Sequence, residues 1–572
     1  MGWFRVRQSQ GSFWFCATAV GIGLIGFSSF PQTAFHDFLS TTHCYQSVRT
    51  HSKATPYVNC FSVTPSGTFS KVFQAAEGSS LAARAQPGFV IPGLWEYATL
   101  YSLFLLGHGH VLQYGEFLNS VDLFGSNSLE DVRGRLESYL SDHPNAGTRK
   151  EWLRGLGWDQ MALGQMPTAA DFAASHQLKD RFIMLDRVDM HCIWVSEAIL
   201  NLLPESIPDV SGGDIVRYPG MGVFCDNAMK IIMDLRPEPD AAKKETFLRS
   251  AMTSLHKVGL VGVHDAGVNP GNLALYRDLV RSSDWTLRVY AMVECYERNA
   301  FCGNEVENVK LFADGALGSW GSALIEPYSD RPDTSGSLLI NSSELTKVAS
   351  AWATKGFQVN IHAIGDLANR NAIDAIEAAL QLTCREPSLA MCQARRRFRI
   401  EHCQIVHPDD QVRMRSIGVI PSIQPTHATS DMAYVVERLG RGRTTEEAYR
   451  MRSLLETGPV LGSDFPIEPC DPFQGIYAAV TRRNPHTGQG TDDFPEGWYA
   501  EEALSLDQAV RGFSEGPAYG SFMEGRAGVI QRGAFADWVV LDKPLEEMDI
   551  EDFRSVNIRE TWVAGKRVYE RN

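Results

Sequence analysis

The sequence predicts an α/β protein, a (β/α)8 TIM-like barrel with a small β-sandwich domain built from both chain ends. Through the middle of the chain, short apolar runs alternate with helical patterns, which is typical of parallel strands joined by crossover helices. Near both ends, short alternating segments separated by turn residues predict antiparallel strands instead. Histidine, lysine and aspartate stand at the ends of several apolar runs, the position at which barrels carry functional side chains.

The 572 residues are too many for one simple core, so we expect several units. The expected units are an N-terminal leader over 1–32, a polar linker over 33–54, the β-sandwich domain over 55–91 together with 525–572, and the barrel over 92–524. The candidate barrel strands are 103–110, 181–186, 258–264, 287–292, 309–313, 357–362, 398–402, 418–423 and 459–464. One of these nine must lie outside an eight-stranded barrel.

Composition excludes some function classes. The net charge of −15 and the lack of a basic stripe argue against a nucleic-acid partner. The chain has 11 cysteines but no CxxC motif, so a zinc ribbon is not expected. The pairs Cys44/Cys60, Cys295/Cys302 and Cys384/Cys392 are close enough in sequence to be bonded, although spacing does not establish pairing. Nothing in the sequence gives the oligomeric state.

The N-terminus has the pattern of a targeting segment. Arg5 and Arg7 precede an apolar stretch over residues 13–30. We expect a signal peptide or, because no small-x-small cleavage site follows, an uncleaved signal anchor that associates with a membrane. The expected location is therefore the membrane or the secretory pathway. The alternatives are an N-terminus that packs on the protein and a gene-model artefact, which would leave the protein cytoplasmic.

A set of metal-ligand residue types ends the apolar runs. His108 and His110 stand two positions apart, so on a strand they point to the same face and can hold one ion. Imidazole and carboxylate groups suit Zn²⁺ or a similar hydrolytic ion. The later members of the set are Lys310, His362, His402 and Asp464.

Each of these residues also has an ordinary structural interpretation. A single histidine on an apolar strand usually belongs to the core, and we interpret His264 in this way. His427 is left open, since it can face either a pocket or the surface. Lys310 can be a cation in an ion pair, and Asp464, after a glycine and a serine, can cap a helix.

When further motifs are considered together with these ligand residues, the chain resembles the amidohydrolase superfamily. Within that superfamily it resembles amidohydrolase family 3, whose members resemble N-substituted formamide deformylases. The resemblance runs from about residue 55 to the end. The motifs that carry it, besides the ligand residues, are WDQ at 158–160, DRVDMH at 186–191, GLVGVHD at 259–265, GALGS at 315–319, GAFAD at 533–537 and GKRVY at 565–569.

The resemblance implies a role for each ligand residue. His108 and His110 would bind the more buried of one or two metal ions, most simply Zn²⁺. His362 and His402 would hold the second ion. Lys310 would bridge both ions as a carboxylated lysine, and Asp464 would bind metal and shuttle the proton.

The resemblance also implies supporting residues. Trp158, His191 and Trp194 would line the substrate pocket, with ordinary packing as the alternative. Asp314 would contact the substrate or support a metal ligand. Asp366 and Glu401 would orient the histidines beside them.

The implied activity is hydrolysis of a non-peptide C–N bond in a small amide or formamide by metal-activated water. A deaminase or cyclic amidase of the same superfamily is one alternative, because the same metal site serves both reactions. An inactive pseudoenzyme or binding protein is the other, and it would purify without stoichiometric metal.

That second alternative follows from a departure from the family pattern. The family places its glycine turn a few residues before the histidine pair, but here ten residues, 97–106, separate Glu96 from Gly107. A mis-set splice boundary is one explanation. In the other, residues 103–106 replace the original strand and residues 92–95 become a loop.

Overall fold

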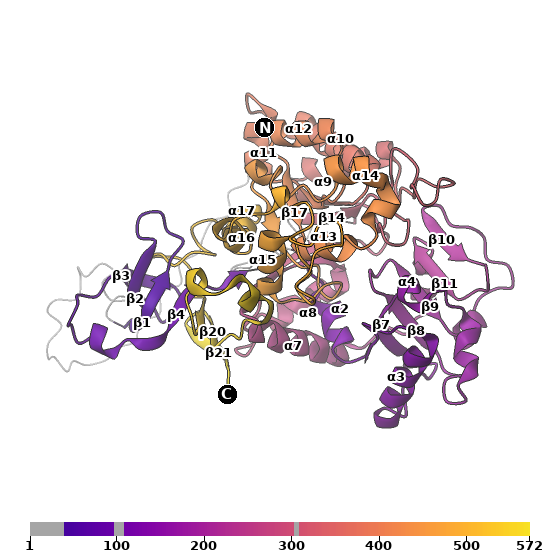
Figure 1. Ribbon diagram of the computed structural model, residues 1–572, viewed down its shortest axis with the longest axis horizontal. Helices are drawn as coiled ribbons and strands as arrows, with labels where there is room; N and C mark the ends of the chain where they lie inside the picture. Colours follow the sequence, from indigo (N-terminus) through magenta and orange to yellow (C-terminus); the bar gives the residue numbers. More distant parts are fainter. Residues whose placement is uncertain (1–38, 96–107, 303–307) are drawn as a thin grey trace, which may run out of the picture.

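The computed structural model describes residues 39–95, 108–302 and 308–572. A central barrel lies between a small β-domain, which carries β1–β4, β20 and β21, and a second sheet that carries β7–β11 (Figure 1). The expected α/β barrel with a β-sandwich domain from both chain ends is confirmed.

Eight parallel strands build the barrel, in the same order as in the sequence. They are β5 (Leu94–Trp95), β12 (Leu260–Val268), β13 (Arg288–Val293), β14 (Asn308–Phe312), β15 (Gln358–Ala363), β16 (Arg399–His402), β17 (Ile420–Ile423) and β18 (Val460–Leu461). Nearly all of their residues are buried, because helices cover the outside and side chains fill the inside. This burial on both faces explains why the strands are continuous apolar runs.

Residues 108–110 close the barrel. On one side, Gly109 N–H donates to the His264 carbonyl of β12 at 3.1 Å. On the other side, Asp464 N–H donates to the His108 carbonyl at 2.9 Å, and His110 N–H donates to the Phe465 carbonyl at 2.8 Å. The first and last strands are therefore joined at the end of the barrel where the histidine pair lies.

Helices connect the strands, and polar caps begin several of them. Asp240 caps α7 by accepting from Lys243 N–H, and Asn341 caps α9 by accepting from Glu344 N–H. The helices of the barrel region are α2 (Val111–Phe117), α7 (Ala241–Lys257), α8 (Pro270–Leu279), α9 (Ser342–Thr354), α10 (Asp366–Thr383), α11 (Leu389–Arg396), α12 (Pro408–Ile417), α13 (Pro425–Asp431), α14 (Val435–Glu447), α15 (Pro472–Thr481), α16 (Leu506–Gly512) and α17 (Glu515–Gly520). Short 3-10 helices are η1 (Ala82–Arg84), η2 (Ala169–Ala174), η3 (Leu455–Thr457), η4 (Ala500–Glu502), η5 (Leu545–Glu547) and η6 (Ile550–Ser555).

A second α/β unit is inserted between the first and second barrel strands. Its six-stranded sheet has the order β10-β11-β9-β8-β7-β6. The candidate strand at 181–186 falls in this sheet, so it is the ninth strand that does not belong to the barrel. The elements of the inserted unit are β6 (Val121–Asp122), α3 (Leu129–Asp142), β7 (Leu153–Trp158), α4 (Gln160–Leu163), β8 (Ile183–Arg187), β9 (Cys192–Val195), α5 (Glu197–Leu200), β10 (Gly213–Val216), β11 (Val223–Asp226) and α6 (Met229–Met233).

The β-sandwich domain is one seven-stranded sheet with the order β21-β20-β19-β4-β1-β2-β3. Thr68 pairs with Phe535, so the sheet curls back on itself around its own core. Alternation in β19 divides its side chains: Trp538 packs into this core, whereas Val539 packs against the barrel. The strands are β1 (Thr41–Arg49), β2 (Tyr57–Val63), β3 (Phe69–Phe73), β4 (Gln86–Pro92), β19 (Trp538–Leu541), β20 (Glu560–Val563) and β21 (Lys566–Glu570).

The linker expected over 33–54 is wrong for most of its described length. Residues 41–49 form β1, which pairs with both β2 and β4 in the middle of the sheet. Tyr45 and Val48 point into the core of the β-domain. Polar residues between them hide the strand pattern in the sequence.

Four disulfides lie in the described chain. Cys44–Cys60, Cys295–Cys302 and Cys384–Cys392 are bonded, as their spacing allows. Cys192–Cys225 is a fourth bond between residues 33 positions apart. Its partners face each other on β9 and β11, so only the pairing of those strands brings them together.

Residues on both sides of the extra ten residues pair with β12. Leu94 pairs with Leu260, which lies 166 positions later, and Gly109 pairs with Asp265, which lies 156 positions later. This difference of ten equals the length of segment 97–106, which lies outside the described residues. Trp95 pairs with Gly262, so the register also shifts by one residue within β5. Leu94 and Trp95 remain a paired strand, so the explanation in which residues 92–95 become a loop is wrong.

The leader expected over residues 1–32 lies outside the described residues. Within the part of the chain that is described, no helix has both the length and the apolar character needed to cross a membrane.

The register predicts the effect of deleting residues 97–106. The shortened chain joins Glu96 to Gly107, so β5 leads directly into the histidine pair, and the ladder with β12 has to absorb only the one-residue shift that it already contains. We expect the melting temperature and the bound metal of this variant to equal or exceed those of the full chain. Calorimetry and elemental analysis of both proteins measure this. Collapse of the fold or loss of metal only in the deletion variant would show that these residues are a working part of the strand.

Candidate metal centre

The barrel brings the expected ligand residues together at the C-terminal ends of its strands. Lys310 lies in β14, His362 in β15, and His402 is the last residue of β16. Asp464 follows β18, and the histidine pair follows β5. All are buried except His110, whose side chain is 19% exposed. The spacing of strand ends around a barrel explains how His108 and Asp464, 356 positions apart, meet.

Asp464 is at the centre of the cluster. Its Oδ1 lies 3.2 Å from Nε2 of His108 and 3.2 Å from Nε2 of His110. Its Oδ2 lies 3.7 Å from Nε2 of His427. Two groups of three can each hold a metal ion, His108 with His110 and Asp464, and His402 with His427 and Asp464. One carboxylate therefore faces both groups.

His427, left open by the sequence, belongs to this cluster. It lies in the first turn of α13, directly after β17, and is only 8% exposed. Its ring stacks parallel to that of His402, with the centroids 5.9 Å apart. The useful signal was its position: the expected strand at 418–423 ends four residues earlier, so His427 lies just beyond the carboxyl end of a barrel strand.

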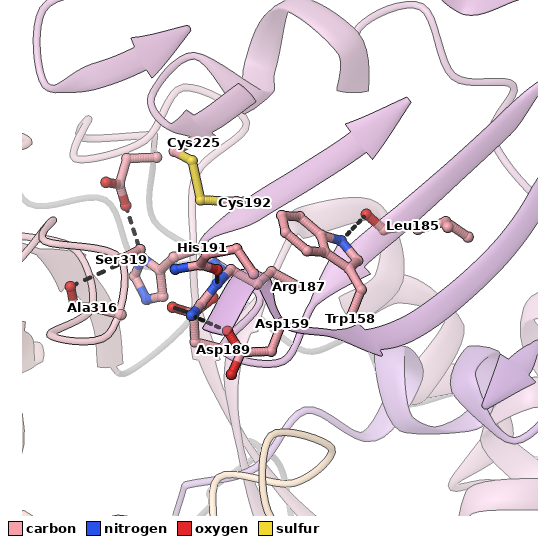
Figure 2. The surroundings of a disulfide bond; sticks show 12 residues. Trp158, Asp159, Leu185, Arg187, Asp189, His191, Cys192, Cys225, Ala316 and Ser319 are labelled. Atoms are coloured by element: carbon pink, nitrogen blue, oxygen red, sulfur yellow. Dashed lines mark hydrogen bonds and ion pairs between the residues drawn. A yellow bond between two sulfur atoms is a disulfide. The ribbon is translucent and has the colours of Figure 1, made fainter. Parts of the chain in front are cut away.

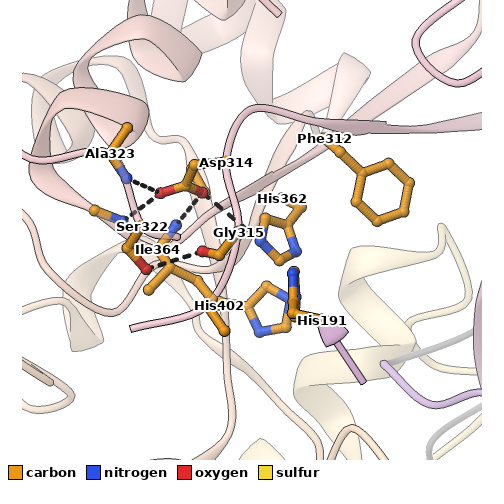
Figure 3. A network of polar contacts seen from close by, with 12 residues as sticks. His191, Phe312, Asp314, Gly315, Ser322, Ala323, His362, Ile364 and His402 are labelled. Carbon is orange, nitrogen blue, oxygen red and sulfur yellow. Dashed lines mark hydrogen bonds and ion pairs between the residues drawn. The ribbon is translucent and has the colours of Figure 1, made fainter. Parts of the chain in front are cut away.

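His362 lies between the cluster and the loop after β14 (Figure 3). Its ring centroid is 4.3 Å from that of His402 and 5.5 Å from that of His191. Its Nε2 is 3.6 Å from Oδ1 of Asp314. His362 thus adjoins the two groups of three without being a member of either.

The backbone at two ligand positions has an uncommon conformation. His402 has a φ of 71° and Asp464 a φ of 62°, in the left-handed region that residues with a Cβ seldom adopt. Such residues gather at functional sites, where the surrounding structure holds them in place. Here the turn directs each side chain into the cluster just as its strand ends.

A buried chain of charges orients His108. Arg399 Nη2 is 2.7 Å from Glu401 Oε1, and Glu401 Oε2 accepts from Nδ1 of His108 at 2.7 Å. Burial alone would raise the pKa of Glu401, but the Arg399 charge and the His108 hydrogen bond lower it to about 2. The ionised carboxylate fixes the proton on Nδ1, so the lone pair of Nε2 faces Asp464. Glu401 thus orients a histidine, but that histidine is His108 and not the adjacent His402 expected from the sequence.

The donor set fits a metal ion. Nε2 of His362 and Nε2 of His427 are buried and have no hydrogen-bond partner among the described residues. Nδ1 of His402 lies 3.1 Å from Oε1 of Gln424, which leaves Nε2 of His402 for a ligand bond. Burial holds the pKa of His362 and of His402 well below the usual value, so both rings are neutral, the form that binds metal.

Lys310 is a buried amine within the cluster. Its Nζ lies 3.2 Å from Nε2 of His108, and the residue is 1% exposed. Burial lowers its pKa to about 8, although Glu401 and Asp464 act in the opposite direction. A larger share of neutral amine is therefore present near pH 7, and the neutral amine is the form that combines with carbon dioxide to give a carboxylated lysine.

Asp314 fixes the backbone next to the cluster. Its carboxylate accepts from the backbone N–H groups of Ile364, Gly365 and Ala323 at 3.0, 2.8 and 2.9 Å (Figure 3). Burial raises its pKa to about 7. It has no exposed surface, and it ties the loop after β14 to the end of β15.

Three other expected site residues lie elsewhere. Trp158 and Trp194 are fully buried in the core of the inserted unit, where their Nε1–H groups donate to the carbonyls of Leu185 and Thr168. Both are packing residues, since no substrate can reach them. Asp366 does not orient a histidine: its Oδ1 accepts from the N–H groups of Ile325 and Leu367, at the start of α10.

The remaining histidines follow the sequence analysis. His264 is a core residue whose Nδ1 lies 2.8 Å from Nη1 of Arg399, as its place inside the barrel requires. His191, expected at the substrate pocket, lies beside His362 and bonds to Asp226. No sequence pattern indicates Asp226, because its partner His191 is 35 positions away.

A barrel with buried histidines and an aspartate at the carboxyl ends of its strands defines a metal-dependent hydrolase. Residues 99–569 match the sequence profile of the amidohydrolase family, and the chain belongs to that family. It is similar to YtcJ of Bacillus subtilis (28% identical, covering 83% of this chain and 90% of YtcJ). It is also similar to the N-substituted formamide deformylase of Arthrobacter pascens (24% identical, covering 78% and 83%).

Solved structures share the fold. An uncharacterized metal-dependent hydrolase from Pyrococcus horikoshii superposes with a TM-score of 0.66 at 23% identity, covering 89% of this chain and 98% of that one. A second such hydrolase, from Pyrococcus furiosus, gives a TM-score of 0.63 at 25% identity, covering 88% and 99%.

The buried contacts among Arg399, Glu401 and His108 predict that Glu401→Gln weakens metal binding. Loss of the carboxylate frees the tautomer of His108, and we expect the affinity for zinc to fall by about 10- to 100-fold. Competition with a chromophoric chelator measures this affinity. Asp366→Asn is the matched control, because it neutralises a buried carboxylate that contacts no ligand residue. Zinc affinity in Glu401→Gln equal to that of the control would contradict the orienting role.

Proposed function

We propose that the protein hydrolyses the C–N bond of a small non-peptide amide or formamide, with Zn²⁺ as the ion. The observation that carries this proposal is Asp464, whose two carboxylate oxygens face two histidine groups inside a buried cluster. The name of the formamide deformylase relative supports the substrate class.

The donor set indicates where ions would be held. His108, His110 and Asp464 would hold one, and His402, His427 and Asp464 a second. His362 and a carboxylated Lys310 lie within reach to complete the sites. A bound divalent ion lowers the pKa of water towards about 7 and polarises a carbonyl group.

Asp464 is the residue that transfers the proton in this proposal. Burial alone would raise its pKa, but the neighbouring histidines, His108 first, hold it well below the usual value. The carboxylate is therefore ionised and can accept a proton from the attacking water. It passes this proton to the leaving nitrogen, which an amide requires because an amine anion is too basic to leave.

Two alternatives share the scaffold. A deaminase or cyclic amidase would use the same cluster and differ in its product. An inactive binding protein would follow from disruption at 97–106. The pairing of both β5 and Gly109 with β12, and the assembled cluster, argue against that disruption.

The proton role predicts the effect of Asp464→Asn. The amide keeps the size of the side chain but cannot accept the proton, so turnover of an amide substrate should fall by a factor on the order of 10² or more. Steady-state kinetics with a panel of formamides and simple amides measures this, with circular dichroism as the check on folding. Near-normal turnover in the variant would rule out the role.

We also propose a cellular location for the protein. The apolar stretch at 13–30 and four disulfides, which persist in oxidising compartments, support the secretory pathway or a membrane anchor. A tagged full-length protein should fractionate with membranes or secretory compartments. A variant without residues 1–32 should be soluble. Full-length protein found free in the cytosol would contradict the location.

A further inference from the structure

The disulfide of the inserted unit lies beside the metal centre. Cys192 and Cys225 face each other on β9 and β11 and are 3% and 7% exposed. His191 directly precedes the first cysteine, and Asp226 directly follows the second. Figure 2 shows the bond next to His191. The covalent link therefore joins the two strands one residue away from a polar pair.

That pair, His191 and Asp226, points toward the cluster. Nδ1 of His191 lies 2.8 Å from Oδ1 of Asp226, and Asp226 N–H donates to the His191 carbonyl at 2.8 Å. The ring of His191 is 5.5 Å from that of His362. Its side chain is 20% exposed, whereas that of His362 is 3% exposed. His191 therefore stands on the accessible side of the centre.

Asp226 is also held from the barrel side. A Cβ on Gly315 would lie 2.4 Å from its Oδ1, and one on Gly321 would lie 2.7 Å from its Oδ2. Only glycines allow the loop after β14 to approach the carboxylate so closely. Asp226 itself has a φ of 51°, a conformation that depends on its surroundings. The disulfide on one side and the glycine loop on the other thus locate this carboxylate.

We propose that Cys192, Cys225 and Asp226 are positioning residues that hold His191 against the substrate. The proposal deepens the hydrolase function and rests on it. With Nδ1 engaged by Asp226, only Nε2 of His191 remains to contact a substrate or its oxyanion. β9 and β11 have four residues each, and the ends of short ladders open easily. The disulfide keeps this end closed, and so keeps the imidazole in place.

The test removes the bond and compares it with a matched disulfide. In Cys192→Ser/Cys225→Ser we expect kcat for the amide substrate to fall at least about tenfold, as small misplacements of a contacting group do, with KM within about threefold. Cys44→Ser/Cys60→Ser is the control, because that bond also joins facing residues of antiparallel strands but lies in the β-sandwich domain. The control should keep its kcat.

A double-mutant cycle separates positioning from general support. If the disulfide acts through His191, its removal from a His191→Gln background should cause no further loss of kcat. An equal loss in both backgrounds would overturn the proposal, because it would mean that the bond stabilises the fold alone. Cys192→Ala/Cys225→Val repeats the test with an apolar facing pair, in case the serine variant does not fold.

A spectroscopic readout keeps the proposal independent of turnover. The Nδ1 proton of His191, hydrogen-bonded to Asp226, should give a downfield imidazole NMR signal that His191→Gln removes. We expect this signal to be lost or broadened without the Cys192–Cys225 bond and kept in the control. An unchanged signal would overturn the positioning role. If the native protein hydrolyses no amide, the proposed function fails, while this signal still decides the positioning.

Discussion

The hydrogen bonds that close the barrel are the constraint on which the rest of the structure depends. Asp464 N–H donates to the carbonyl of His108, and His110 N–H donates to the carbonyl of Phe465. The same bonds that join the last strand to the first bring the ligand-bearing side chains within 3.2 Å of one another. The hydrogen bonds that close the barrel therefore also assemble the site.

Burying so many polar groups is stable only when each is neutral or paired. An uncompensated buried charge costs several kcal/mol, and burial keeps the rings of His362 and His402 neutral. Arg399 and Glu401 pair with each other, with side chains that have no exposed surface. Asp464 is an anion that faces the nitrogens of His108, His110 and His427, an arrangement that a divalent cation would stabilise.

Local sequence patterns predicted many of the barrel strands and ligand residues. Short apolar runs that carry a ligand residue predicted the strands of Lys310, His362 and His402, since a strand buried on both faces is a continuous apolar run. Features created by pairing were not visible: the strand at 41–49, the Cys192–Cys225 bond and the contact of Asp226 with His191. The resemblance also misled at Trp158 and Trp194, because a large aromatic residue can serve core packing as readily as a substrate pocket.

Metal content tests the central claim, that the cluster around Asp464 holds a divalent ion, most directly. Elemental analysis of the purified full chain should give at least one equivalent of tightly bound ion, with zinc as the expected element. His108→Ala, which removes one nitrogen from the group that includes His110 and Asp464, should lose most of it. Less than about a tenth of an equivalent in the unmutated protein would contradict the account.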